Sequence, residues 1–335
     1  MSPSRPTLLT LRALGLGDLL TAIPALRALR RAYPRHRHVL AAPEALRPLV
    51  LATGAVDELL PTAGLGPVRW DGPSPSVACN LHGRGPESHE MLEAVRPGRL
   101  LAFRRDAAGS VPDPDSATWD PDEHEVDRWC RMLRAYGLDA DPRDVDLVPP
   151  PGPLDDQLVG ATVIHPGAAS ASRRWPTDRF AAVAASEWAA GRTVVITGTS
   201  AERDLALDVA TRAGLPVSAV LSGRTNLGTL ARVVSAAGLV VCGDTGVGHL
   251  ATAVGTPSVL LFGPTSPDRW GPPKCSRHHV LWHGSLGDPH APSVDPGLLS
   301  ISAAEVLAAI RSIRRAAAHG SGTDGGIPEI AAASD

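Results

Sequence analysis

The sequence predicts an α/β protein with two doubly wound lobes, each built on a parallel sheet covered by helices. Strand-like apolar runs alternate with helix-like segments in both halves of the chain, which is the pattern of βαβ units. A proline-rich run separates the halves. The chain has 335 residues with 43% hydrophobic content, which is enough for two cores of ordinary domain size.

The first half contains four apolar runs of strand length and two segments with helical spacing. Pro24 falls in the early turns of the first helix, where proline is tolerated, and Gly137 ends the second helix. We expect strands at residues 7–14, 39–42, 77–81 and 99–103, and helices at residues 19–33 and 124–136.

A stiff segment then interrupts the pattern. The run Val148-Pro149-Pro150-Pro151-Gly152-Pro153 cannot join the middle of a sheet and suits an interdomain connector. We therefore expect one domain over residues 1–152 and a second over residues 153–318.

The second half repeats the alternation. We expect strands at residues 161–165, 193–197, 239–242 and 258–262, a short apolar region around Leu221, and helices at residues 177–190, 201–213, 227–237, 247–254 and 303–318. The glycine-rich segment that follows lacks core-forming residues, so residues 319–335 are expected to form a flexible tail.

Composition excludes several classes of function. A formal net charge of -3 gives no electrostatic basis for general nucleic-acid binding. The four cysteines, Cys79, Cys130, Cys242 and Cys275, are widely spaced without a CxxC pair, which favours a reduced cytoplasm over a disulfide framework or a zinc site. The first residues lack the pattern of a leader peptide and no apolar run reaches membrane-spanning length, so we expect a protein that is neither secreted nor membrane-spanning.

The most informative turn follows the strand expected at residues 239–242. Asp244 and Thr245 can cap the helix that begins near Gly246, and the free backbone N–H groups at that helix start favour an anion. This arrangement predicts a site for a phosphorylated ligand.

A second glycine turn follows the first strand. Gly15 and Gly17 leave room for a ligand, but Leu20 stands where a dinucleotide fingerprint has its third glycine, so a dinucleotide site is disfavoured. Asp18 lies at the helix start, where its carboxylate can serve as a cap or as a base that faces the cleft.

Several motifs together resemble one family. The opening segment Leu14-Gly15-Leu16-Gly17-Asp18-Leu19-Leu20-Thr21-Ala22-Ile23-Pro24 is similar to that of the bacterial heptosyltransferases, glycosyltransferase family 9. The second half adds five further motifs that resemble the donor domain of that family: His165-Pro166-Gly167-Ala168, Arg173-Arg174-Trp175-Pro176, Leu221-Ser222-Gly223-Arg224-Thr225-Asn226-Leu227, Gly243-Asp244-Thr245-Gly246-Val247-Gly248-His249-Leu250-Ala251 and Leu261-Phe262-Gly263-Pro264-Thr265-Ser266-Pro267-Asp268-Arg269-Trp270-Gly271-Pro272. The resemblance covers residues 7–315 and is faint between residues 60 and 130.

The resemblance implies a GT-B enzyme, in which two Rossmann-like domains face each other across an interdomain cleft. It implies inverting sugar transfer from a nucleotide-sugar donor, with neither a metal nor another cofactor. In that family the aspartate of the opening motif is the general base, which carries onto Asp18. One carboxylate suffices, because a nucleotide diphosphate leaves with little protonation.

The resemblance also implies a set of donor contacts. The turn formed by Asp244, Thr245, Gly246 and Val247 would hold the diphosphate, and His249 would either donate to a phosphate or lock the turn against a carbonyl. Arg173 stands where the family commonly has a lysine near the phosphates, and Arg174 is the alternative candidate for this phosphate contact. Glu202, with Thr199 before it, aligns with an acid that contacts the donor ribose, although a glutamate in a first helical turn has a structural explanation as well.

Acceptor contacts are less defined. Gly17, His82 and Arg84 are our candidates, with Ser88 beside them. Arg27, Arg30, Arg31, Arg35 and Arg37 complement the dipole of the first helix or contact an anionic acceptor or a membrane surface. His278, His279, His283 and His290 are expected in a solvated loop, since their spacing matches no metal motif.

Three classes of function remain open from the sequence alone. The first is a cytoplasmic glycosyltransferase that moves heptose from an ADP-linked donor to a saccharide, lipid or small-molecule acceptor. The second is a nucleotide-sugar epimerase or hydrolase of the same fold, which turns over the donor without an acceptor. The third is a nucleotide-sugar-binding protein without activity, whose binding would be indifferent to Asp18→Asn.

Overall fold

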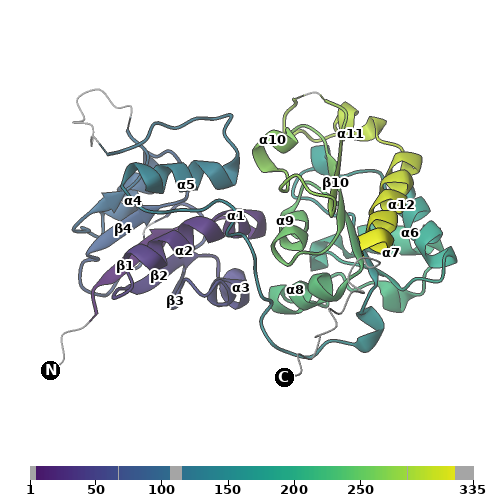
Figure 1. The fold of residues 1–335 in the computed structure, drawn as a ribbon, viewed down its shortest axis with the longest axis horizontal. Coiled ribbons are helices and arrows are strands. Elements are labelled where there is room, and N and C mark those ends of the chain that lie inside the picture. Colours follow the sequence, from purple (N-terminus) through teal and green to yellow (C-terminus); the bar gives the residue numbers. More distant parts are fainter. Residues whose placement is uncertain (1–4, 67, 106–114, 285, 321–335) are drawn as a thin grey trace, which may run out of the picture.

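The computed structural model describes residues 5–66, 68–105, 115–284 and 286–320. These residues form two α/β lobes, one coloured purple to blue and one teal to yellow in Figure 1. Each lobe contains one five-stranded sheet in which all strands are parallel. The predicted fold class is confirmed.

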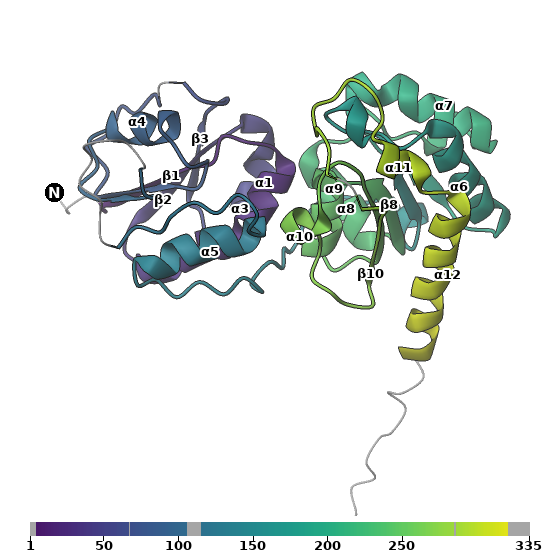
Figure 2. The same cartoon turned by 90° about the horizontal axis from the view of Figure 1, so that it is seen from above.

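The sheet of the first lobe has the strand order β3-β2-β1-β4-β5. Successive residues of β1 point to opposite faces, so Leu8 packs with one apolar cluster while Leu9 and Leu11 pack with another. Figure 2 shows α4 and α5 on opposite faces of this sheet. Its elements are β1 (Thr7–Leu11), α1 (Leu16–Thr21), α2 (Ile23–Ala32), β2 (Arg37–Ala42), α3 (Arg47–Ala52), β3 (Glu58–Pro61), β4 (Val77–Asn80), α4 (Glu87–Glu93), β5 (Leu100–Leu101) and α5 (Glu125–Ala135).

The sheet of the second lobe has the strand order β10-β9-β8-β6-β7. Leu239 and Val241 pack on one face of β8, while Val240 and Cys242 pack on the other face with residues of α8 and α9. Its elements are β6 (Thr162–His165), α6 (Thr177–Ala189), β7 (Val194–Ile196), α7 (Arg203–Ala213), α8 (Leu227–Ala236), β8 (Leu239–Gly243), α9 (Gly246–Ala253), β9 (Ser258–Phe262), α10 (Pro267–Trp270), β10 (His278–Trp282), α11 (Pro296–Ser300) and α12 (Ala303–Gly320).

The strands of the first sheet all precede residue 152, and those of the second all follow residue 153. The exact domain boundary between them stays a prediction. An extended segment joins the lobes, and Arg27 and Arg31 of α2 both form ion pairs with Asp144 in it, at 2.6 and 2.8 Å. Arg30 pairs with Asp57 at 2.9 Å. Arg27 and Arg31 therefore help to hold the connector against the first lobe, while the Arg30 contact lies within that lobe.

Three expectations about helices and strands need correction. The helix expected at residues 19–33 is two helices that meet at Ala22, and the second has Pro24 in its first turn, where a missing N–H costs no hydrogen bond. The strand expected at residues 99–103 is reduced to Leu100–Leu101. α12 runs to Gly320, two residues into the expected tail, and residues 321–335 lie outside the described part of the chain.

The expectation for the histidine-rich segment was also wrong in part. His278 and His279 belong to β10, the edge strand beside β9, and not to a solvated loop. The edge strand β3 and the helices α3, α4, α10 and α11 have no counterpart among the predicted elements. Among the described residues, no helix is both long and apolar enough to cross a membrane.

Candidate active site

Both sheets reverse their strand order next to a central strand, between β1 and β4 in the first lobe and between β6 and β8 in the second. Ligands of open α/β sheets bind at the carboxyl ends of the strands at such points. The turns after β1, β6 and β8 line a cavity of about 560 Å³, to which the turn after β4 contributes no lining residue. The cavity is lined from the first lobe by Gly15, Leu16, Gly17 and Asp18, and from the second by residues that include His165, Arg173, Thr199, Glu202, Asp244, Thr245, Gly246, Val247 and His249.

The N-terminus of α9 opens into this cavity without a side-chain cap. Thr245 is the N-cap residue, but neither its hydroxyl nor Asp244 caps the helix, which corrects our expectation. The backbone N–H groups of Gly246 and Val247 lie in the first helical turn, where no intrahelical acceptor exists. Because Gly246 and Val247 also line the cavity, their amides are available to an anion there.

Asp244 and Arg173 lie next to this helix start. Burial raises the pKa of Asp244 to about 6, although the nearby Arg173 guanidinium acts in the opposite direction. Arg173 ends a short 3-10 helix, Ala171–Arg173, and its buried Nε has no hydrogen-bond partner in the described part of the chain. A buried donor without a partner is costly, so a ligand oxygen would satisfy it. Arg174 is absent from the residues that line the cavity, and its Nε donates to the Ala168 carbonyl at 2.9 Å.

Glu202 and Thr199 belong to the second-lobe wall of the cavity. Glu202 Oε2 accepts hydrogen bonds from the Thr199 backbone N–H at 2.7 Å and from the Thr199 hydroxyl at 2.9 Å. A Cβ atom at Gly167 would come within 2.1 Å of Glu202 Oε1, so the glycine at this position makes room for the carboxylate. Glu202 therefore does cap the turn at Thr199 through Oε2, and its other oxygen, Oε1, is left for another partner.

Asp18 lies on the first-lobe wall of the cavity with 28% of its side chain exposed. Its Oδ2 accepts a hydrogen bond from the Gly15 backbone N–H at 3.1 Å, while Oδ1 is 3.6 Å from Nη2 of the buried Arg12. The contact with Gly15 is a cap of α1. One carboxylate can thus order the glycine turn and still present an oxygen to a substrate.

The two lobes touch where α1 meets α9. A Cβ atom at Gly17 would come within 2.8 Å of the His249 ring, and one at Gly246 within 2.8 Å of Leu16 Cβ. His249 also packs edge-on against Trp270, with the ring centroids 5.8 Å apart. Burial lowers the pKa of His249 to about 4, so its imidazole is neutral at pH 7. Gly17 therefore serves the contact between the lobes, a role that its sequence context did not indicate.

The remaining acceptor candidates lie beside the turn after β4. His82 Nδ1 accepts a hydrogen bond from the Ala13 backbone N–H at 3.2 Å, which leaves the proton of the neutral ring on Nε2. Burial and the Arg12 charge lower the pKa of His82, against the opposing effect of Asp18. Arg84 is exposed. Ser88 is buried, and its hydroxyl accepts a hydrogen bond from Asn80 at 2.9 Å, so it is not exposed for contact with an acceptor as expected.

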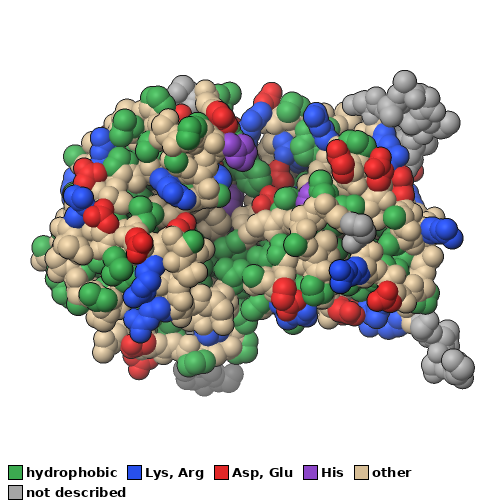
Figure 3. All heavy atoms as spheres, turned by 180° about the vertical axis from the view of Figure 1, so that it is seen from behind, with side chains coloured by type: hydrophobic (Ala, Val, Ile, Leu, Met, Phe, Trp, Pro, Cys, Tyr) green, Lys and Arg blue, Asp and Glu red, His purple; other side chains and the backbone are tan. Residues whose placement is uncertain are grey.

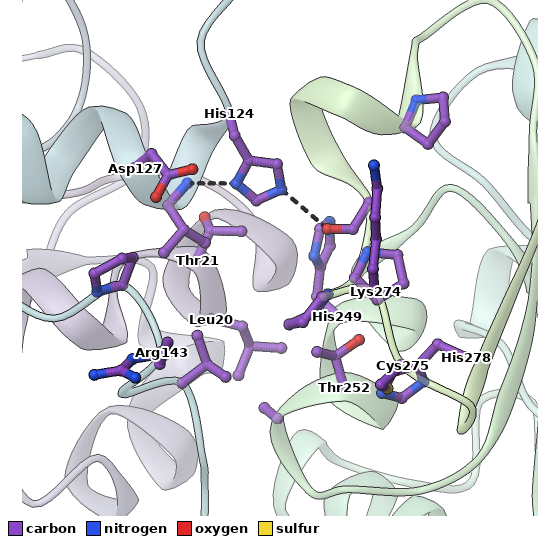
Figure 4. Close-up of a pocket in the computed structure, with 18 of the residues that line it drawn as sticks. Leu20, Thr21, His124, Asp127, Arg143, His249, Thr252, Lys274, Cys275 and His278 are labelled. Carbon is purple, nitrogen blue, oxygen red and sulfur yellow. Dashed lines mark hydrogen bonds between the residues drawn. The ribbon is translucent and has the colours of Figure 1, made fainter.

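A second cavity of about 570 Å³ lies on the other side of the α1 and α9 contact, and His249 borders both cavities. Figure 3 shows the molecule hollowed between the lobes on its rear face. In Figure 4, His124 bridges the lobes above this cavity: its Nδ1 accepts from the Val126 N–H at 3.3 Å, and its Nε2–H donates to the Gly271 carbonyl at 3.0 Å. Asp122 and Arg269 form a further ion pair between the lobes.

Two of the histidines considered as metal ligands have separate side-chain partners. His278 Nδ1 is 2.9 Å from the Ser258 hydroxyl, and His283 Nε2 is 2.8 Å from Glu305 Oε1. Over the described residues, no group of three or more histidine, cysteine or acidic side chains is arranged to hold a metal ion.

Arg12, beside the site, was not predicted from the sequence, and Trp270 was part of a motif of the family resemblance without a role of its own. Arg12 is 1% exposed although it lies just after β1, and a charged residue inside the predicted strand at residues 7–14 was the signal that could have revealed it. Trp270, the last residue of α10, also lines the cavity.

Comparisons with known proteins agree with this architecture. The model of a family described as glycosyltransferase family 9 (heptosyltransferase) matches residues 102–289, more than half of the chain. A glycosyl transferase family 9 structure from Veillonella parvula aligns with a TM-score of 0.73 at 19% identity, covering 93% of this chain and 98% of that one. The ADP-heptose lps heptosyltransferase II of E. coli aligns with a TM-score of 0.69 at 19% identity, covering 93% of this chain and 99% of that one. The E. coli heptosyltransferase WaaC with ADP-2-deoxy-2-fluoro heptose aligns with a TM-score of 0.66 at 17% identity, covering 91% of this chain and 99% of that one. A search of curated proteins gave no match.

Proposed function

This chain belongs to glycosyltransferase family 9 and has the GT-B fold, and we propose that it transfers heptose from an ADP-linked donor to an acceptor hydroxyl, with inversion and without a metal. One observation carries this proposal: Asp18 and the uncapped N-terminus of α9 line the same cavity from opposite lobes. A proton acceptor and an anion site therefore face one another, as sugar transfer from a nucleotide diphosphate requires.

In the proposed mechanism, the leaving diphosphate is bound by the α9 amides and by Arg173. Asp18 accepts the proton of the acceptor hydroxyl, and the oxygen of that hydroxyl attacks the anomeric carbon from the face opposite the diphosphate. The bond to the diphosphate breaks as the new glycosidic bond forms, so the configuration inverts. The amides and the guanidinium stabilise the negative charge that develops on the departing phosphate oxygen.

The donor nucleotide extends in this proposal from α9 toward Glu202, whose Oε1 would accept a hydrogen bond from a ribose hydroxyl. Two similar E. coli structures support the choice of nucleotide, since their names include ADP-heptose and an ADP-linked heptose analogue. His249 would meet the phosphates as a neutral donor.

The acceptor is a saccharide, a lipid or a small natural product in this proposal, and it approaches Asp18 past His82 and Arg84. A lipid acceptor would require contact with a membrane surface. Free cysteines at all four positions, three of them buried, support a cytoplasmic location.

Stabilisation of the purified protein by nucleotides tests the donor class directly. ADP is expected to raise the melting temperature more than GDP, UDP or TDP, because a ligand that binds only the folded state stabilises it by mass action. NAD serves as the control for a dinucleotide site. Formation of a glycosylated acceptor together with ADP identifies a transferase, whereas ADP release that no acceptor increases identifies a hydrolase. Recovery of an altered nucleotide-sugar would identify an epimerase. A response to NAD alone would contradict the proposed donor.

Asp244 makes ADP binding dependent on pH. Its pKa is raised to about 6 in the folded protein, so its carboxyl is charged above that pH and repels the bound phosphates. Asp244→Asn is expected to tighten ADP binding about threefold to tenfold at pH 8, equivalent to roughly 1 kcal/mol of relieved repulsion. The effect should vanish by pH 5, where wild-type Asp244 is protonated.

Isothermal titration of ADP from pH 5 to pH 8 checks this expectation. The phosphates of ADP also titrate in this range, so the measured quantity is the ratio of the two Kd values at each pH. A ratio that stays constant across the range would show that the Asp244 charge is not felt at the ADP site.

A further inference from the structure

Arg12 is a buried cation directly behind Asp18. It follows β1 and is 1% exposed, which is costly for a guanidinium unless its donors are satisfied. Its Nε donates to the Asp18 backbone carbonyl at 2.7 Å, and its Nη2 donates to the Thr21 hydroxyl at 3.2 Å. Its Nη1 donates to the Leu81 carbonyl. Arg12 therefore ties α1 to the turns after both central strands of the first lobe.

Glu125, the first residue of α5, balances this charge. Its Oε1 accepts from Arg12 Nη2 at 2.9 Å and from Trp129 Nε1 at 2.8 Å. Burial acts to raise the pKa of Glu125, but Arg12 and Arg128 outweigh burial and hold that pKa below its ordinary value. The guanidinium of Arg12 also lies over the Trp129 ring, 4.9 Å from its centroid. Arg12 is thus fixed from α5, independently of α1.

The helix that carries Asp18 depends on this anchor. α1 has six residues, and its N-cap residue is a glycine with no side chain, so that the Asp18 carboxylate itself is the cap. So short a helix has little stability of its own. Arg12 holds it by the Asp18 carbonyl and by Thr21, whose hydroxyl also donates to the Asp18 carbonyl at 3.1 Å.

The same guanidinium faces the Asp18 carboxylate. Nη2 is 3.6 Å from Oδ1, close enough for charge attraction but beyond a direct hydrogen bond. Oδ2 is held by the Gly15 N–H on the other side. The carboxylate is therefore oriented by both neighbours, while Oδ1 keeps a lone pair for the proton of a substrate.

We propose that Arg12 is the positioning residue of the transfer reaction: anchored by Glu125, it fixes the place and orientation of the Asp18 carboxylate toward the acceptor hydroxyl. This inference rests on the proposed role of Asp18 as general base. A purely structural role would make Arg12 equivalent to any buried arginine of the same network.

Arg128 provides the matched control. It is 6% exposed, and its Nη1 pairs with the same Glu125 carboxylate. Its Nη2 donates to the carbonyls of Asp120, Pro121 and Glu123, and its guanidinium lies over Trp119 at 4.3 Å. These contacts hold α5 and the loop before it, and none involves α1. Arg128→Lys therefore disturbs the buried network without disturbing the support of Asp18.

The test compares Arg12→Lys and Arg128→Lys by ADP release from ADP-heptose at high enzyme concentration, with water as acceptor. Lysine keeps the charge but cannot make the separate bonds of Nε, Nη1 and Nη2. We expect Arg12→Lys to lower kcat about 10- to 100-fold with the donor KM within about threefold of wild type, whereas Arg128→Lys leaves kcat within about threefold. Equal losses in the two variants, or an unchanged kcat in Arg12→Lys, would overturn the proposal.

A double-mutant cycle with Asp18→Asn gives the second readout. If Arg12 acts through Asp18, Arg12→Lys should lower the residual rate of Asp18→Asn by less than about threefold; multiplicative losses would show an independent, structural effect. If the Asp18→Asn variant released ADP as fast as the wild-type protein, the proposed function itself would be overturned. Should Arg12→Lys fail to fold, the charge-balanced pair Arg12→Met with Glu125→Gln enters the same comparison with the same criteria.

Discussion

Asp18→Asn is expected to lower the turnover number by about 10²- to 10⁴-fold, the usual contribution of a positioned general base. Asparagine has nearly the same shape, and its side-chain oxygen can still accept the Gly15 N–H hydrogen bond that Asp18 Oδ2 accepts at 3.1 Å. It cannot take the proton of an acceptor hydroxyl. The measurement is kcat for ADP release from ADP-heptose, with the ADP-induced shift in melting temperature as the test of donor binding, which should be unchanged.

Asp268→Asn is the control for this substitution. Asp268 lines the second cavity beyond the α1 and α9 contact and is absent from the residues that line the cavity with Asp18. Its replacement should leave kcat within about threefold, because distant carboxylates influence a reacting centre weakly through solvent. Loss of activity in both variants to the same extent would argue that general charge, and not proton transfer at Asp18, supports the reaction.

The sequence predicted those parts of the site that local pattern encodes. A buried strand, a polar turn and a helix start follow one another within residues 239–247, so this strand-turn-helix unit, on which the proposed anion site rests, was visible without tertiary information. The place of Asp18 at a helix start was visible in the same way, whereas its role as a base came from the family resemblance and stays a prediction. The edge strand β10 was not, because its residues are all partly exposed and it contains two adjacent histidines, which removes the apolar signal of a strand.

Contacts between distant segments lay beyond such patterns. Arg12 and Glu125 are separated by 113 positions, and only the folded first lobe brings them together. The same holds for Gly17, whose missing side chain makes room for the His249 ring of the other lobe. A glycine in a ligand-binding turn and a glycine at a lobe contact look identical in sequence, since both need only the absence of Cβ.

Arg173→Met is expected to weaken ADP binding about 10- to 100-fold, since hydrogen bonds to charged groups contribute roughly 1.5–3 kcal/mol. Methionine retains much of the side-chain volume and removes the charge. Arg174→Met is the adjacent control, because Arg174 donates to the Ala168 carbonyl and does not line the cavity. It should bind ADP within about threefold of wild type. Titration calorimetry of both variants gives the comparison, and equal weakening would mean that the two cations act through long-range attraction alone.

A series of ligands locates the Arg173 effect on the nucleotide. The guanidinium lies near Asp244 beside the start of α9, so it should act on phosphates and not on the nucleoside. Arg173→Met should therefore reduce affinity for ADP strongly and for adenosine by less than about twofold, since only the former carries charge for the arginine to bind. Arg173→Lys, which restores the charge without a bidentate fork, should recover part of the ADP affinity. If adenosine binding falls as much as ADP binding, Arg173 contacts the nucleoside, and the diphosphate must lie elsewhere in the cavity.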